Sequence, residues 1–148
     1  MNRKITYTDP TKLDIGCKGC TKEGYTGIDK LDFGQDVLWD VRQGIPFANN
    51  SVTDIYCNNF LEHLADADME LFFTELYRIC KNDANIEIVV PDSGSMGAYT
   101  HNHFSFWNEL RFEGLIKGFE NNWFTIEKMY KIPQRYYEEL RVYLKVVK

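Results

Sequence analysis

Two short apolar segments near the start of the chain, each followed by a residue suited to nucleotide binding, constrain the fold most. Leu13-Asp14-Ile15-Gly16-Cys17 predicts a strand that ends at a glycine, and Tyr25-Thr26-Gly27-Ile28-Asp29 predicts a second strand that ends at an acid. A glycine lets a ligand approach the backbone without a Cβ in the way. A carboxylate after the next strand can accept hydrogen bonds from both hydroxyls of a ribose. The pair therefore indicates a cofactor that contains adenosine.

Strand-like and helix-like segments alternate along the chain, which is typical of an α/β fold. Apolar residues recur at helical spacing between Met69 and Cys80, with acids at the start of this segment and basic residues at its end. A second helix is expected to be capped by Ser105 and to stop at Gly118. The strands expected before and between these helices are residues 12–15, 25–28, 36–39, 53–57 and 84–90.

The end of the chain predicts two long strands, at residues 122–130 and 138–147, with Pro133 in the turn between them. Sequential strands with a short connection pair antiparallel. We therefore expect one domain with a Rossmann-like, seven-stranded mixed sheet whose last strands are antiparallel. Only about eight residues separate the first two strands, whereas a parallel crossover normally takes a dozen or more. No helix fits between Asp29 and Asp36 either, so we expect reduced helical cover there, and apolar surface that the second subunit of a homodimer would bury.

Composition excludes several classes of function. The chain has 148 residues, a net charge of -5 and no cluster of Lys and Arg, so nucleic acid is not an expected partner. No apolar run approaches the roughly 18 residues of a membrane helix. The first ten residues lack the apolar centre of a secretion signal, and we expect a cytoplasmic protein.

The cysteines give little support for a metal or redox site. Cys17-Lys18-Gly19-Cys20 matches C-x-x-C, but a zinc site would need two further ligands. The best candidates, His101 and His103, lie far away in the sequence in a different kind of segment. We therefore expect no metal, and two reduced cysteines in a tight turn.

Four motifs in order along the chain resemble those of the class I S-adenosylmethionine-dependent methyltransferases, especially the small, type 11-like members. Besides the two strand ends described above, they are Ile45-Pro46-Phe47-Ala48-Asn49-Asn50-Ser51-Val52-Thr53-Asp54-Ile55, Asn59-Phe60-Leu61-Glu62-His63-Leu64, Glu75-Leu76-Tyr77-Arg78-Ile79-Cys80-Lys81 and His103-Phe104-Ser105. The resemblance covers roughly residues 12 to 147. One departure falls at the glycine turn, where Lys18 replaces a second glycine that the family usually has.

The resemblance implies S-adenosylmethionine as cofactor and a role for each matching residue. The turn at Gly16 and Cys17 would lie against the methionine part, Asp29 would hold the ribose, and Asp40 would accept a hydrogen bond from the adenine amino group. Lys18 would either crowd the cofactor or contact its carboxylate. The full expected cofactor-binding set is Asp14, Gly16, Cys17, Lys18, Asp29, Lys30, Asp40, Val41, Asn58 and Asn59.

Methyl transfer needs alignment above all, and a general base only where the acceptor must lose a proton. His101 and His103 are the residues we expect to act as such a base, although capping or packing would equally explain them, and a catalytic role for His63 is the weaker alternative. The acidic chain and the aromatic residues around 99–107 favour a small-molecule or sugar-type acceptor.

Three functions stay open at this point, namely a methyltransferase, a binding module without catalysis and a dehydrogenase. Asp29 and Asp40 are also good turn caps, and Lys18 breaks the glycine pattern, so a non-catalytic protein that kept the fold and acts as a binding module is the main alternative. A nicotinamide-dependent dehydrogenase would need G-x-G-x-x-G opening a helix, and Gly16-Cys17-Lys18-Gly19 provides neither.

Overall fold

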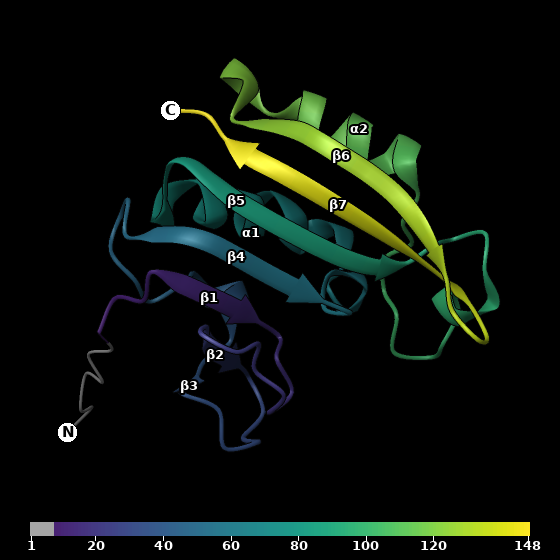
Figure 1. The fold of residues 1–148 in the computed structure, drawn as a ribbon, viewed down its shortest axis with the longest axis horizontal. Coiled ribbons are helices and arrows are strands. Elements are labelled where there is room, and N and C mark those ends of the chain that lie inside the picture. Colours follow the sequence, from purple (N-terminus) through teal and green to yellow (C-terminus); the bar gives the residue numbers. More distant parts are fainter. Residues whose placement is uncertain (1–7) are drawn as a thin grey trace.

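A computed structural model describes residues 8–148, and their seven strands form one sheet in the order β3-β2-β1-β4-β5-β7-β6 (Figure 1). The first five strands are parallel, whereas β7 runs antiparallel between β5 and β6. The mixed sheet with antiparallel last strands is confirmed. The bounds are β1 Lys12–Ile15, β2 Thr26–Asp29, β3 Val37–Leu38, β4 Val52–Asn58, β5 Cys80–Pro91, β6 Phe124–Pro133 and β7 Glu138–Val146.

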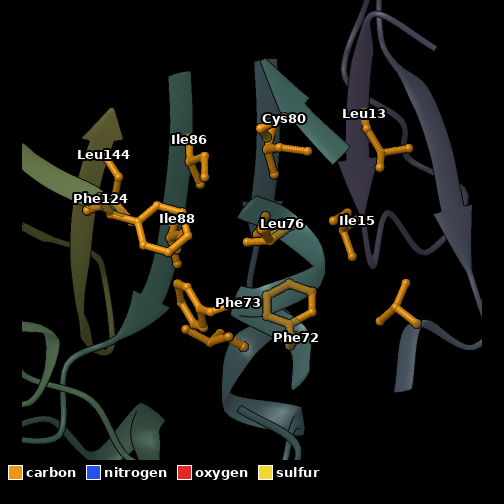
Figure 2. Packing of buried hydrophobic residues seen from close by; sticks show 14 of the residues in the cluster. Leu13, Ile15, Phe72, Phe73, Leu76, Cys80, Ile86, Ile88, Phe124 and Leu144 are labelled. Carbon is orange, nitrogen blue, oxygen red and sulfur yellow. The ribbon is translucent and has the colours of Figure 1, made fainter. Parts of the chain in front are cut away.

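The α-helices of the described part, α1 (Asp66–Ile79) and α2 (Glu109–Gly118), lie on the same side of this sheet (Figure 1). Acids in the first turn of α1 and Arg78 in its last turn complement the helix dipole. Its buried residues recur at helical spacing, so one stripe of the helix faces the strands. Figure 2 shows Phe72, Phe73 and Leu76 of this stripe against apolar side chains of the strands. The core therefore fills the space between α1, α2 and one face of the sheet.

The connections from β1 to β2 and from β2 to β3 contain no helix, as the short spacing predicts. The loop at residues 16–25 folds over the opposite face of the sheet instead. The backbone N–H of Lys22 donates to the carboxylate of Asp14 at 2.8 Å, and the Lys22 ammonium lies 4.2 Å from the centre of the Tyr56 ring. A polar loop thus covers the centre of the face that a crossover helix would otherwise cover.

The face opposite α1 carries a row of polar side chains in the middle of the sheet. Asp14, Tyr56, Glu87 and Tyr143 are neighbours across four adjacent strands. The Tyr143 hydroxyl donates to Glu87 at 3.1 Å, and Lys22 pairs with Glu87 at 3.3 Å. The exposed apolar side chains near the β3 edge are Leu31, Phe33 and Leu38, which are 49–55% exposed. Some of the apolar surface that we expect from the missing helices is therefore present at this edge.

Two details of the predicted elements are wrong. Ser105 does not cap α2: its hydroxyl donates to the carbonyl of Leu61 and accepts from the indole of Trp107, whereas Asn108 caps the helix. Pro133 does not lie in the turn but ends β6, which is an edge strand, where a residue without an N–H is tolerated.

The structure bears on two sequence-based expectations, the absence of a membrane-spanning helix and the absence of a secretion signal. Across residues 8–148, no helix has the length and apolar character needed to cross a membrane. Residues 1–7, which carry most of the segment searched for a secretion signal, lie outside the described part of the chain.

Candidate functional site

A cavity of about 280 Å³ opens at the carboxyl ends of the first parallel strands. Open α/β sheets bind ligands at this edge. Six residues of the expected cofactor-binding set line the cavity, namely Gly16, Lys18, Asp29, Lys30, Asp40 and Val41. The remaining lining is largely apolar, with Ile28, Trp39 and Phe60 among its walls.

Gly16 ends β1 in a left-handed conformation with a φ of 72°. A Cβ at this position would lie 2.2 Å from the ring of Phe60, which follows β4. The glycine is therefore required both by the backbone conformation and by the close packing of Phe60. Phe60 in turn forms one wall of the cavity.

Asp29 holds its own turn and faces the cavity with the same carboxylate. One oxygen accepts the backbone N–H of Lys18 and the other accepts that of Leu31, both at 3.1 Å. An ionised carboxylate offers about four lone-pair sites, so two remain for a ligand. The turn-capping interpretation and the binding interpretation of Asp29 are thus compatible.

Lys18 stands in the left-handed region with a φ of 48°. A glycine adopts this conformation without strain, so the backbone keeps the turn that the usual glycine would make. The Lys18 side chain is exposed at the cavity lining. The replacement therefore changes the charge at the mouth of the cavity and leaves the path of the backbone intact.

Asp40 is held by Arg42, which has no signature in the sequence that marks it as a site residue. Its carboxylate caps the short helix at Val41–Gln43 and receives the Arg42 guanidinium at 2.6 to 3.1 Å. These hydrogen bonds from Arg42 lower the pKa of Asp40. The carboxylate is thus charged, but a ligand group must share it with Arg42.

At the other end of the cavity, Glu62, His63 and His103 form a cluster. Glu62 and His63 belong to the short helix η2 (Leu61–His63), which follows β4, and His103 lies in the loop after β5. Glu62 is 2% exposed, and neither carboxylate oxygen has a hydrogen-bond partner in the described part of the chain. Burial raises the pKa of Glu62 to about 7 and lowers that of His63.

Backbone carbonyls fix the orientation of both histidines. The Nδ1 of His63 lies 2.9 Å from the carbonyl of Asn102, and the Nδ1 of His103 lies 2.8 Å from that of Ala98. A carbonyl can only accept, so each Nδ1 carries the proton and each Nε2 has a free lone pair when the ring is neutral. The two rings meet edge to face, with their centres 4.9 Å apart.

The other expected site residues lie outside the cavity lining. Asp14 is buried beneath the loop at residues 16–25. Cys17 is buried within this loop and forms a tight turn with the exposed Cys20, closed by a backbone hydrogen bond. The remaining four are Asn58, Asn59, His101 and His103.

His63 lines the cavity although it is the histidine that we expect least to be catalytic. The signal for this cluster is the dipeptide Glu62-His63, which is separated from β4 by three residues. Its pairing with His103 depends on the path of the loop after β5 and has no local signature.

Comparison with known proteins identifies the fold. A family model described as a methyltransferase domain matches residues 28–88. The sequence matches no curated protein. The resemblance to class I methyltransferases is thus confirmed in sequence over residues 28–88.

Solved methyltransferases share the fold of nearly the whole chain. The Burkholderia thailandensis 1,6-didemethyltoxoflavin-N1-methyltransferase, solved with 1,6-didemethyltoxoflavin and S-adenosylhomocysteine, superposes with a TM-score of 0.73 at 12% identity, over 94% of this chain and 72% of that one. A methyltransferase from Haloferax volcanii, solved with the Trm112 methyltransferase activator, gives 0.72 at 13%, over 99% and 86%. An Archaeoglobus fulgidus methyltransferase described as dependent on S-adenosylmethionine gives 0.67 at 18%, over 90% and 85%.

Proposed function

The chain has the class I methyltransferase fold, and we infer that it is an S-adenosylmethionine-dependent methyltransferase that acts on a small-molecule or sugar-type acceptor. One observation carries this proposal. The ends of three neighbouring parallel strands meet at a single cavity and bring Gly16, Asp29 and Asp40 to its wall. These are the positions at which the family resemblance implies the methionine, ribose and adenine contacts.

The donor and acceptor groups of the cavity fit such a cofactor. We propose that Asp29 accepts hydrogen bonds from the ribose hydroxyls with the lone pairs that its own turn leaves free. Asp40 would accept from the adenine amino group, with Val41 beside the ring. Lys18 and Lys30 would lie near the carboxylate of the methionine part.

When bound, the cofactor supplies an activated methyl group on a sulfonium. The strand order then sets its direction in the cavity, because the cavity runs from the end of β3 at Asp40 to the residues after β4 at His63. With adenine bound at the β3 side, the residues after β4 would lie nearest to the methyl group. The acceptor would therefore enter beside Phe60, His63 and Phe104.

This acceptor end favours a small planar molecule or a sugar. Phe104 lines the cavity and is 63% exposed, so its ring is free to pack against a ligand. Beyond the cavity lining, Tyr99 stacks on Phe106 with ring centres 5.0 Å apart. The acidic chain makes nucleic acid the less suitable acceptor. The free cysteines are consistent with a reducing compartment, so we propose that the reaction takes place in the cytoplasm.

For acceptors that must lose a proton, we keep His103 as the proposed base, now together with His63, whose ring it contacts. His101 remains the second proposed histidine, although it is exposed and outside the cavity lining. Unchanged methylation after replacement of both His101 and His103 by Ala would rule this role out.

One observation favours the alternative of a binding module without catalysis. The guanidinium of Arg42 already satisfies the Asp40 carboxylate, so adenine would have to share it. A thermal-shift series with S-adenosylmethionine, S-adenosylhomocysteine and NAD separates the candidate functions. We expect stabilisation by the first two compounds and none by NAD; no stabilisation by any of them would favour the binding module.

A further inference from the structure

We propose that Glu62, His63 and His103 form a binding site for one divalent transition-metal ion at the acceptor end of the cavity. One candidate ligand atom from each of these residues lies within 4.8 Å of the other two. Ligand atoms held about 2 Å from a single ion can be at most about 4 Å apart, so only a small inward movement of the side chains is needed. Two imidazoles and a carboxylate suit a first-row ion such as Zn²⁺ or Co²⁺ better than Mg²⁺, which prefers oxygen ligands.

The carboxylate of Glu62 is the first argument for a bound cation. It is 2% exposed, and neither oxygen accepts a hydrogen bond from the described part of the chain. Buried carboxylates are normally paired, hydrogen-bonded or coordinated to a metal. The His63 Nε2 lies 3.8 Å from the nearer Glu62 oxygen, which is too far for a hydrogen bond. The protein groups therefore do not satisfy this carboxylate by themselves.

The orientation of the two histidines is the second argument. Each ring donates its Nδ1 proton to a backbone carbonyl, of Asn102 for His63 and of Ala98 for His103. This is the arrangement that fixes ligating histidines in metal sites, because it leaves Nε2 free and directs its lone pair. Two histidines from separate segments, η2 and the loop after β5, are thus oriented in the same way, and they meet at a buried carboxylate without a hydrogen-bond partner in the described part of the chain.

The position of the cluster suggests what the ion would do, and this step rests on the proposed methyltransferase function. His63 lines the cavity at the end opposite Asp40. An ion there would select acceptors that present an oxygen, and would lower the pKa of an acceptor hydroxyl. While His63 and His103 bind the ion through Nε2, neither ring has a lone pair left to act as a base. With the ion bound, the ion would therefore take the place of the proposed histidine base, and the hydroxyl proton would leave to solvent. The new O–CH₃ bond would form as the S–CH₃ bond breaks, and the electron pair of that broken bond would stay on sulfur.

Titration of tag-free, metal-free protein with Co²⁺, followed by its visible absorption, tests the site without any turnover. We expect one equivalent to bind. Glu62→Gln and His103→Ala should each weaken binding by at least about tenfold, since ligand loss exceeds the effect of losing an outer contact. The matched controls are His101→Ala, which removes the exposed histidine outside the cluster, and Cys20→Ser, which removes the exposed thiol. Both should bind as the wild type does.

The wild-type titration decides the matter even if a variant is unstable. Absence of stoichiometric Co²⁺ binding to the folded wild type would overturn the proposal. So would binding that survives Glu62→Gln and His103→Ala, or that is lost in His101→Ala or Cys20→Ser. Binding of S-adenosylhomocysteine is measured separately on the same protein. A chain that binds this compound but not Co²⁺ would contradict the metal site and leave the methyltransferase proposal standing.

Discussion

Single side chains at the cavity serve the fold and the site together. Gly16 is needed for the left-handed turn after β1, and its missing Cβ leaves the space that the Phe60 ring fills. Asp29 closes the next turn and keeps lone pairs toward the cavity. Lys18 adopts the conformation of the glycine that it replaces. At this scale, residues that look like ordinary turn formers are also the ones that a cofactor would touch.

Gly16→Ala should destabilise the protein by roughly 2–4 kcal/mol, because the strain of a left-handed alanine adds to the overlap with Phe60. Gly24→Ala is the matched control. Gly24 has a similar φ of 80° but no atom within 4 Å of a built Cβ. It should therefore cost only the strain, roughly 1–2 kcal/mol. Urea unfolding of both variants measures the difference, and equal losses would show that Phe60 does not require the glycine.

The positions that contact the cavity could be predicted only where the sequence signal is local. Gly16, Asp29 and Asp40 each lie at or within two residues of a strand end, and strand ends can be identified from hydrophobicity and turn residues. Arg42 and Glu62 were not predicted as part of the site. Arg42 belongs to the site through its ion pair with Asp40. Glu62 belongs to it because a distant loop buries its carboxylate in the folded chain. Burial and long-range pairing depend on the folded chain.

At the scale of elements, α1 is joined to the loop before β4 by a half-buried ion pair. Glu75 accepts two hydrogen bonds from Arg78 at 2.8 Å and one from the backbone of Ile45 at 2.7 Å. Arg78 also donates to the carbonyls of Ile45 and Phe47. The block Ile45-Pro46-Phe47, read from the sequence as a family motif, thus owes its place to the end of α1.

Glu75→Gln should lower the free energy of unfolding by roughly 1.5–3 kcal/mol near neutral pH. The hydrogen bonds from Arg78 lower the pKa of Glu75 below its ordinary value of 4.5. A depressed pKa means that this stabilisation is complete above that value and is lost as the pH falls through the folded-state pKa. The difference between wild type and variant should therefore shrink in acid.

Urea unfolding of both proteins across this pH range measures the effect. Glu113→Gln is the control, since Glu113 pairs with Lys117 at 3.9 Å on the exposed face of α2. It should change stability by less than about 0.5 kcal/mol at any pH. A constant difference for Glu75→Gln down to acid pH would contradict the assigned role of the carboxylate.

Most elements followed from periodicity, whereas their ends did not. The stripe from Met69 to Ile79 predicted α1, and the alternation in the last segments predicted β6 and β7. Ser105 looked like a helix cap because it precedes an apolar run. In the folded chain, the indole of the buried Trp107 donates a hydrogen bond to the Ser105 hydroxyl. The helix therefore begins later, with Asn108 as its cap. Tertiary packing overrides the local signal at such ends.

For the whole molecule, the main consequence of the short crossovers is a sheet with both α-helices of the described part on one face (Figure 1). The opposite face carries a row of polar side chains at its centre, and exposed apolar residues lie near β3. A second copy of the chain can bury exposed apolar side chains near this edge.

We accordingly keep the prediction of a homodimer and place its interface at the β3 edge. Light scattering at increasing concentration should give the mass of a dimer, and Leu38→Lys should shift it to a monomer, because a charged side chain opposes burial of the apolar surface near this edge. A wild-type protein that stays monomeric at high concentration would contradict this prediction.

The central claim is that the cavity binds an S-adenosylmethionine-type cofactor through Asp29, and calorimetric titration with S-adenosylhomocysteine tests it most directly. We expect one site per chain for the wild type, and at least about tenfold weaker binding for Asp29→Ala, equal to about 1.4 kcal/mol. Asp32→Ala, which changes a nearby exposed acid outside the cavity lining, should bind as the wild type does. The absence of binding to folded wild type, or equal affinity in Asp29→Ala, would contradict the claim.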